Sequence, residues 1–386
     1  MRSLFSRQAA PMRKLITAGV ALLALTSAVP AQAAPATPDL PRPTGPRPIG
    51  VTELHLVQHG RPDPFVPGET RELMVSVWYP ALPLGRRAPY VAPALADYYT
   101  ATGPPAGLAT DWKAIRTHSR TNAPALPGKF PVVLYSPGVG NPRALGTILV
   151  EELASRGYVV VTIDHTYETA VAFPDGTVKP AKAFDVPVEE REKAKQRMMD
   201  AREDDARFVI DNLGRFPTAD ESRTGMFGHS GGGITAGRVM QADRRVNAGI
   251  NLDGWYQFGY NRPEKGVDRP FMMMGGGSNP AQPPLFGKPR NHLTEPDWGA
   301  FWNASTGPML DLNIPTGMHY TFTDGQWLFP RTPGDHSRFI GTVDPKAAID
   351  AQRAYVPAFF DQYLKGRHQP LLAGPSPRHP DVKFVR

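Results

Sequence analysis

A serine flanked by glycines constrains the fold of this 386-residue chain more than any other feature of its sequence. The segment Gly228-His229-Ser230-Gly231-Gly232 follows a short apolar run at 224–227 and precedes a run with helical spacing at 231–242. A G-x-S-x-G pattern in that setting predicts a strand that turns sharply into a helix with the serine at the apex, because only small residues fit so tight a turn. A plain glycine-rich turn around a solvated serine is the alternative.

From residue 131 onward, short apolar runs alternate with amphipathic segments, which is typical of βαβ units in a mainly parallel sheet. We expect strands at 131–135, 158–163, 224–227, 248–252, 270–274 and 310–314, and helices at 143–156, 189–213, 231–242 and 345–365. Pro357 is expected to interrupt the last helix. The runs 51–57 and 72–79 predict an antiparallel pair at a sheet edge. The fold class is therefore α/β, with helices on both faces of a mainly parallel central sheet and an antiparallel N-terminal edge.

The N-terminal 33 residues have the pattern of a secretory signal peptide. A basic start precedes an apolar stretch at 15–29, and Ala31-Gln32-Ala33 offers a cleavage site, with Met12 as an alternative start. Without this leader the net charge falls from +7 to +3, so the basic balance does not indicate nucleic-acid binding. Later runs are too short to span a membrane, so we expect an exported, soluble protein, periplasmic or extracellular. Its oligomeric state stays open.

The remaining chain divides into a Pro/Ala-rich linker at 34–48 and a single domain at 49–386. Residues 81–128 lack a clear periodicity, and either an insertion over the active site or a plain surface excursion would account for them. Cysteine is absent, which excludes disulfides, cysteine nucleophiles and thiolate zinc sites. There is also no phosphate-binding or dinucleotide fingerprint, so we expect neither a cofactor nor a metal.

A serine hydroxyl is a weak nucleophile, and it needs a histidine base held by a carboxylate. Where these groups follow successive parallel strands, their chain order is serine, acid, histidine. Asp253, at the end of the strand expected at 248–252, is the predicted acid. The competing carboxylates are Asp268, Asp297, Asp311 and Asp324.

His319 is the predicted base because it follows the last core strand, 310–314. The alternatives are His292, His336, His368 and His379, of which His336 is the nearest rival. The oxyanion of an acyl-transfer intermediate would need two N–H donors. We assign them to Gly231, which follows the serine, and to Val139, in the loop after the strand 131–135, although that loop could be a simple turn.

Other residues near the predicted site have two interpretations each. His165 ends a strand and is interpreted as a rim or structural residue. Met272-Met273-Met274 is more typical of a buried strand than of a ligand site. An acyl pocket could be formed by Trp255, Phe258, Trp302 and Tyr320, although aromatic core packing would explain them equally.

These segments together resemble the α/β-hydrolase group that contains the plasma-type platelet-activating factor acetylhydrolases and bacterial secreted esterases and lipases. The likeness rests on Ser136–Gly140, Gly228–Gly232, Asn251–Gly254 and Gly317–His319, within residues 50 to 365. Cutinase-like polyester hydrolases share G-H-S-x-G-G but carry their acid one strand later, where this chain has no carboxylate. Two positions depart from the resemblance: Pro137 stands where the group often has His, and Gly231 where a bulky residue is common.

The resemblance implies Ser230 as nucleophile, Asp253 as acid, His319 as base, and Val139 and Gly231 as oxyanion donors. It also implies a cofactor-independent hydrolase of small-molecule or lipid carboxylic esters that forms an acyl-enzyme. A peptidase or lactone hydrolase on the same fold, or an exported binding protein without catalysis, are the alternatives.

Overall fold

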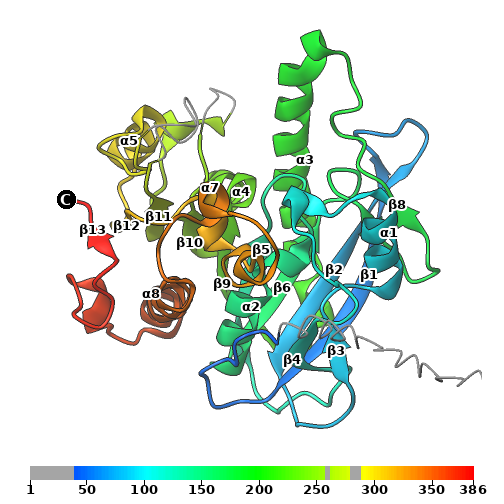
Figure 1. The fold of residues 1–386 in the computed structure, drawn as a ribbon, viewed down its shortest axis with the longest axis horizontal. Coiled ribbons are helices and arrows are strands. Elements are labelled where there is room, and N and C mark those ends of the chain that lie inside the picture. Colours follow the sequence, from blue (N-terminus) through cyan, green and yellow to red (C-terminus); the bar gives the residue numbers. More distant parts are fainter. Residues whose placement is uncertain (1–38, 257–260, 279–287) are drawn as a thin grey trace, which may run out of the picture. The chain divides into compact units, whose positions relative to one another are not determined.

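In the computed structural model, which describes residues 39–256, 261–278 and 288–386, eleven strands form one sheet. Their order is β13-β12-β11-β10-β9-β5-β6-β2-β1-β4-β3 (Figure 1). Their bounds are β1 Ile49–Pro62, β2 Thr70–Pro80, β3 Arg87–Pro89, β4 Arg116–Thr121, β5 Phe130–Ser136, β6 Val159–Asp164, β9 Ala219–His229, β10 Val246–Leu252, β11 Phe271–Gly276, β12 Met309–Ile314 and β13 Lys383–Phe384. The strands from β6 through β5, β9, β10 and β11 to β12 run parallel, and β2 pairs antiparallel with both β1 and β6. The predicted fold class is confirmed.

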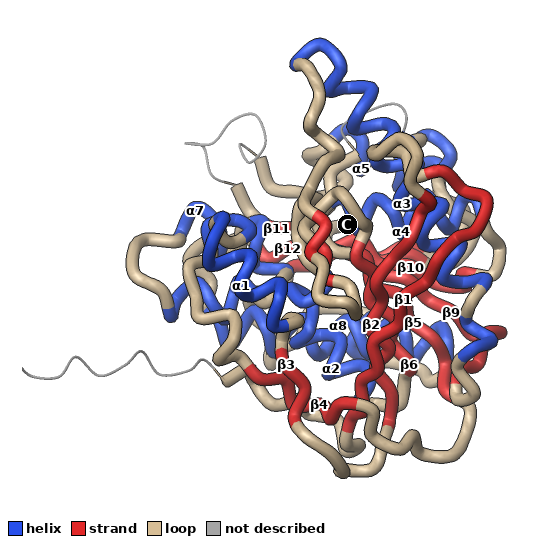
Figure 2. Tube along the Cα trace, turned by 90° about the vertical axis from the view of Figure 1, so that its right-hand side faces the viewer, coloured by secondary structure: helices blue, strands red, loops and turns tan. Residues whose placement is uncertain are grey.

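Alternation along the buried strands produces two hydrophobic layers. On β5, Val133 and Tyr135 face α2 (Thr147–Ser155) and α8 (Pro345–Lys365), whereas Val132 and Leu134 face α3 (Arg191–Asp211) and α4 (Gly231–Ala242). Figure 2 shows the strands in red with blue helices on either side. Since successive side chains of a strand point to opposite faces, a sheet buried on both sides needs apolar residues at nearly every position.

Shorter elements complete the fold. They are α1 Pro93–Thr102, α5 Pro296–Ala304, α6 Gly325–Leu328, α7 Ser337–Ile340 and a separate two-stranded ribbon of β7 Val171–Ala172 and β8 Val178–Lys179. Within the described ranges, none of the helices is both long and apolar enough to cross a membrane.

Two expectations about regular structure are wrong. The pair β1–β2 is antiparallel as predicted but does not form the sheet edge, because β4 pairs in parallel with β1 and β3 pairs with β4. Both outer strands come from the segment 81–128, whose polar and proline-rich sequence hides them. Helix α8 continues through Pro357, since Tyr355, Val356 and Phe359 around it are buried and their packing outweighs one missing backbone hydrogen bond.

Residues 39–48, expected to form a linker, have no helix or strand but are fastened to the domain. Leu40 is buried, the backbone N–H of Thr44 donates to Glu152, and Arg353 donates to the carbonyl of Pro41. The predicted signal peptide lies outside the described residues.

Candidate active site

Ser230 occupies the predicted strand-to-helix turn, between the end of β9 and the start of α4. Its φ of 54° is unusual for a residue with a side chain and marks local backbone strain. A Cβ on Gly232 would lie 1.8 Å from the carbonyl oxygen of Ser136, and one on Gly228 would lie 2.5 Å from the same atom. Glycine is therefore required at both positions for the turn to approach β5.

A continuous chain of hydrogen bonds links Ser230, His319 and Asp253. The Oγ of Ser230 lies 2.9 Å from Nε2 of His319, and Nδ1 of the same imidazole lies 2.6 Å from Oδ2 of Asp253. Because Nδ1 faces a carboxylate, it carries the proton, and Nε2 is left as an acceptor for the serine hydroxyl. Sequence reasoning selected these three residues, and the structure brings them together.

Asp253 is buried and held in place by several donors. Its Oδ1 accepts from the N–H of Gly276, and Arg290 donates to both its Oδ2 and its carbonyl oxygen, at 3.1 and 2.7 Å. Burial alone would raise the pKa of Asp253, but the Arg290 charge and the hydrogen bond from His319 outweigh it and lower that pKa. The carboxylate is therefore ionised at neutral pH.

The histidine of the G-x-S-x-G motif supports the loop that carries His319. Nε2 of His229 donates to the carbonyl oxygen of His319 at 2.9 Å, and the two rings lie 4.5 Å apart. Burial, followed by the nearby His319, lowers the pKa of His229 well below its ordinary value. His229 therefore stays neutral, and its proton is committed to this structural bond.

The two residues predicted to donate to an oxyanion lie side by side. A Cβ on Gly231 would lie 2.7 Å from Cγ2 of Val139. In the described part of the chain, neither amide N–H donates a hydrogen bond to another residue. Gly231 also begins α4, where the helix dipole favours negative charge.

The loop that carries Val139 rests on a buried ion pair. Arg202 of α3 donates to Glu168 and, through Nη1, to the carbonyl oxygen of Pro137 at 2.8 Å. Glu168 in turn accepts from the N–H of Gly140 at 3.3 Å. Charged groups thus bind the loop on both sides of Val139.

A second Ser–His–Asp arrangement lies behind the same loop. The Oγ of Ser136 lies 2.9 Å from Nε2 of His165, whose Nδ1 lies 2.9 Å from Asp205. All three side chains are at most 2% exposed. Asp205 also pairs with Arg71, and burial lowers the pKa of His165. The serine is closed to solvent, which favours a structural role for this set, one of the two roles expected for His165.

Most of the rival candidates for the acid and the base are engaged elsewhere. His292 binds Asp311 at 2.7 Å, and Nε2 of His336 lies 2.8 Å from the hydroxyl of Thr332. The carboxylate of Asp268 pairs with Arg244 and Arg269, and Asp324 binds Tyr90 and the N–H of Ile148. Of the remaining three, Asp297 lies in the first turn of α5, His368 is exposed beyond α8, and His379 packs on Tyr355.

The aromatic residues considered for an acyl pocket do not form one group. Tyr320 packs edge-to-face on His319, whereas Trp302 stacks on His292. The Trp255 ring lies under Arg290, and Phe258 is outside the described residues. Tyr320 and Trp255 thus adjoin the triad, whereas Trp302 packs on the separate His292–Asp311 pair.

Sequence reasoning missed the residues that support the site. Arg202, Glu168 and Arg290 carry no motif, and only a fold that places α3 and the loop after β11 against the site makes them neighbours. His229 stood inside the motif, and its position beside the serine was the one available signal.

Comparisons with known proteins relate the chain to acetylhydrolases and esterases. Residues 108–213 match the family model described as platelet-activating factor acetylhydrolase, isoform II. A probable 1-alkyl-2-acetylglycerophosphocholine esterase from Arthroderma benhamiae is 27% identical over 66% of this chain and 66% of its own length. The platelet-activating factor acetylhydrolase of Cavia porcellus is 28% identical over 37% of this chain and 39% of its own.

A solved structure matches over a larger share of the chain. The ferulic acid esterase from Streptomyces cinnamoneus superposes with a TM-score of 0.78 and is 37% identical over 91% of this chain and 100% of the solved one. The predicted resemblance is therefore confirmed. The chain belongs to the α/β-hydrolase family of carboxylic ester hydrolases that includes the platelet-activating factor acetylhydrolases and bacterial esterases.

Proposed function

We propose that the chain is a secreted serine hydrolase of carboxylic esters in which Ser230, His319 and Asp253 form the catalytic triad. The observation that carries the proposal is the unbroken set of contacts, 2.9 Å from Ser230 to His319 and 2.6 Å from His319 to Asp253. Export rests on the leader pattern at residues 1–33.

In this mechanism Nε2 of His319 takes the hydroxyl proton as Ser230 Oγ attacks the ester carbonyl. The carbonyl oxygen becomes an oxyanion and accepts from the N–H groups of Gly231 and Val139. Collapse of this intermediate breaks the bond to the alcohol, which leaves with the proton held by His319. Water then attacks the acyl carbon and loses a proton to His319, which passes it to Ser230 Oγ as the bond to the acyl group breaks and the acid leaves.

The relatives suggest two acyl groups. An acetyl ester of a glycerophospholipid is suggested by the family model and the fungal relative, and a hydroxycinnamate ester is suggested by the name of the solved esterase. The greater identity and coverage of the solved esterase favour testing methyl ferulate beside p-nitrophenyl acetate. A peptide anilide and a lactone in the same panel would reveal the peptidase and lactonase alternatives.

The first experiment is labelling of the purified protein with a fluorophosphonate, followed by mass spectrometry of the modified peptide. Label on Ser230, and its loss in a folded Ser230→Ala variant, is the expected result. Folded wild-type protein that takes no label would contradict an activated serine and would favour the binding-protein alternative.

A further inference from the structure

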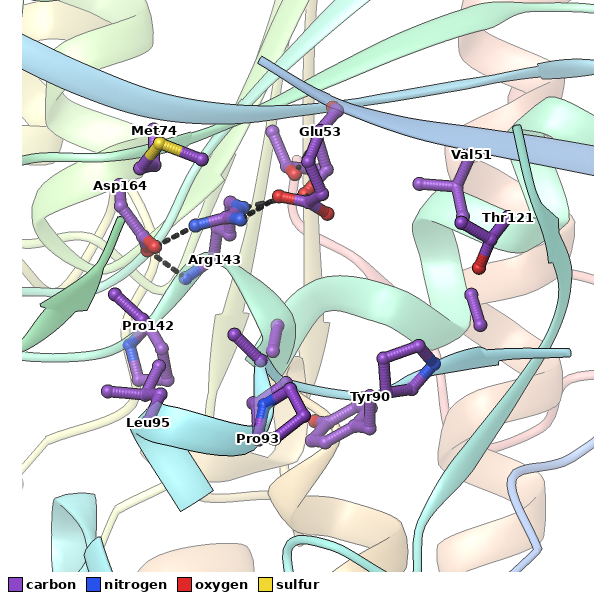
Figure 3. A pocket seen from close by; sticks show the side chains of 18 of the residues that line it. Val51, Glu53, Met74, Tyr90, Pro93, Leu95, Thr121, Pro142, Arg143 and Asp164 are labelled. Carbon is purple, nitrogen blue, oxygen red and sulfur yellow. Dashed lines mark hydrogen bonds and ion pairs between the residues drawn. The ribbon is translucent and has the colours of Figure 1, made fainter. Parts of the chain in front are cut away.

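The segment 81–128 encloses a cavity against the sheet, and no residue of the triad lines it. The cavity has a volume of about 370 Å³ and lies between β1, β2 and β6 on one side and the start of α1 on the other (Figure 3). This volume lies within the range of small-molecule sites, roughly 300–1,000 Å³. Neither Ser230 nor His319 lines it.

Most of the lining is apolar and contains three aromatic rings. Trp78 comes from β2, Tyr90 from the segment 81–128, and Phe173 follows β7. Each is less than 10% exposed, as are Met74 and Leu95 beside them. Rigid aromatic walls with few exposed atoms favour a flat apolar group over a hydrated one.

One end of the cavity is charged. Figure 3 shows Arg143 between Asp164 and Glu53, opposite Tyr90 and Pro93. Arg143 forms ion pairs with both carboxylates, and its Nε donates to Ser76 at 2.6 Å. Two carboxylates face one guanidinium, so this end carries a net charge of about −1.

The burial of this cluster is uneven. The side chain of Asp164 is 1% exposed, whereas that of Glu53 is 52% exposed. Burial raises the pKa of Asp164, with Arg143 opposing it. Glu53, whose Oε1 also accepts from Ser76 at 2.7 Å, is therefore the carboxylate of this pair that a ligand can reach.

We propose that this cavity is a second ligand site, which binds a flat aromatic group bearing a hydroxyl or ammonium donor directed at Glu53. The aromatic walls hold the body of the ligand, and the carboxylate excess rejects a carboxylate head. The site does not depend on the proposed catalysis, and its ligands need not be substrates.

The site also borders the loop predicted to hold the oxyanion. Pro142 and Arg143 line the cavity and directly follow the loop, and the backbone N–H of Arg143 donates to Asp164 at 2.7 Å. The next residue, His165, binds Ser136 at the start of that loop. The loop after β5 therefore borders the proposed oxyanion site at Val139 and the cavity at Pro142.

The test is calorimetric titration of the Ser230→Ala protein with three probes that share one bicyclic body: 2-naphthylmethylammonium, 2-naphthylmethanol and 2-naphthoate. The expected result is that the ammonium and the alcohol both bind. The ammonium should bind about fivefold or more tighter than naphthoate, because a single partly exposed carboxylate contributes a modest electrostatic preference. Glu53→Gln should remove that preference while leaving the alcohol unchanged.

Substitutions that fill the cavity locate the binding. Ala92→Trp at the exposed mouth and Ala88→Leu in the wall both lie on the lining and should weaken the alcohol about tenfold. Leu84→Trp, on an exposed side chain of the same segment away from the lining, is the matched control and should change nothing. Naphthoate binding as tightly as the ammonium, affinity unchanged in both filling variants, or no binding of any probe would each overturn the proposal.

Discussion

The guanidinium of Arg202 donates to the carbonyl oxygen of Pro137 at 2.8 Å, so a fully buried cation of α3 fixes the backbone two residues before Val139. The same cation would lie 3.7 Å from a Cβ on Gly231. Arg202 therefore lies close to the backbone of both proposed oxyanion donors, Val139 and Gly231.

We expect Arg202→Met to lower kcat by about 100-fold with little change in KM, because displaced oxyanion donors act on the transition state. Leaving Glu168 buried without its partner also destabilises the fold, by about 3–5 kcal/mol. The double variant Arg202→Met/Glu168→Leu removes both charges and should recover stability without recovering kcat. Thermal unfolding and steady-state kinetics measure the two effects, and recovery of kcat in the double variant would reduce Arg202 to a purely structural role.

Asp253→Asn should lower kcat by roughly 10⁴-fold, because an amide can hold His319 in the wrong tautomer. Steady-state kinetics on p-nitrophenyl acetate would measure the loss. Asp311→Asn, which alters the similar His292 pair away from the serine, is the control and should retain activity. A near-normal rate for Asp253→Asn would assign the acid to another carboxylate.

Arg290→Met should raise the pKa of Asp253, since the Arg290 charge helps hold it below its ordinary value against burial. A depressed carboxyl pKa keeps the group ionised as pH falls, so its loss moves the acid limb of the kcat/KM profile to higher pH. Arg290→Lys keeps a positive charge and should shift the limb less. An acid limb that stays in place for Arg290→Met would show that the ionisation of Asp253 does not limit activity at acid pH.

The two glycines that follow Ser230 should differ sharply in how well they tolerate substitution by alanine. Gly232→Ala places a Cβ 1.8 Å from a backbone oxygen. Gly231→Ala comes close only to the end of the Val139 side chain, at 2.7 Å, and meets Arg202 at an ordinary contact distance of 3.7 Å. We expect Gly232→Ala to abolish soluble folded protein or phosphonate labelling. Gly231→Ala should fold and keep measurable activity. Equal behaviour of the two variants, by circular dichroism and labelling, would refute this account of the turn.

Asp324 should make stability fall as pH rises. Burial raises its pKa to about 7, with hydrogen bonds from Ile148 and Tyr90 opposing. The folded state then keeps a proton that the unfolded chain releases near pH 4, so stability decreases from about pH 4 to 7. Asn can make both hydrogen bonds without a charge. Asp324→Asn should therefore gain on the order of 2 kcal/mol at pH 8, measured by urea unfolding.

The same unfolding series at pH 4 should show little difference between Asp324→Asn and the wild type, because the carboxyl is protonated there in the folded state. Glu190→Gln, on an exposed side chain, is the control and should not alter the slope. An equal gain at pH 4 and pH 8 would show that the ionisation of Asp324 is not the cause.

The parallel core strands could be predicted because each is a short apolar run followed by a turn signal, as with 248–252 and Asp253. The G-x-S-x-G motif selected Ser230, and chain order together with strand ends selected Asp253 and His319. The strands β3 and β4 could not be found in this way, because Arg116–Thr121 is largely polar and its pairing depends on a partner far away in the sequence. The supporting ion pairs were also hidden, since Glu168, Arg202 and Arg290 meet only after folding.

The double attachment of the segment 81–128 limits how its ligand site could change. Its strand β4 extends the sheet beside β1, and the hydroxyl of its Tyr90 donates to Asp324 at 2.9 Å. A wall hydrogen-bonded at both ends cannot swing like a hinged lid. New selectivity would therefore arise by exchanging lining side chains within a fixed frame.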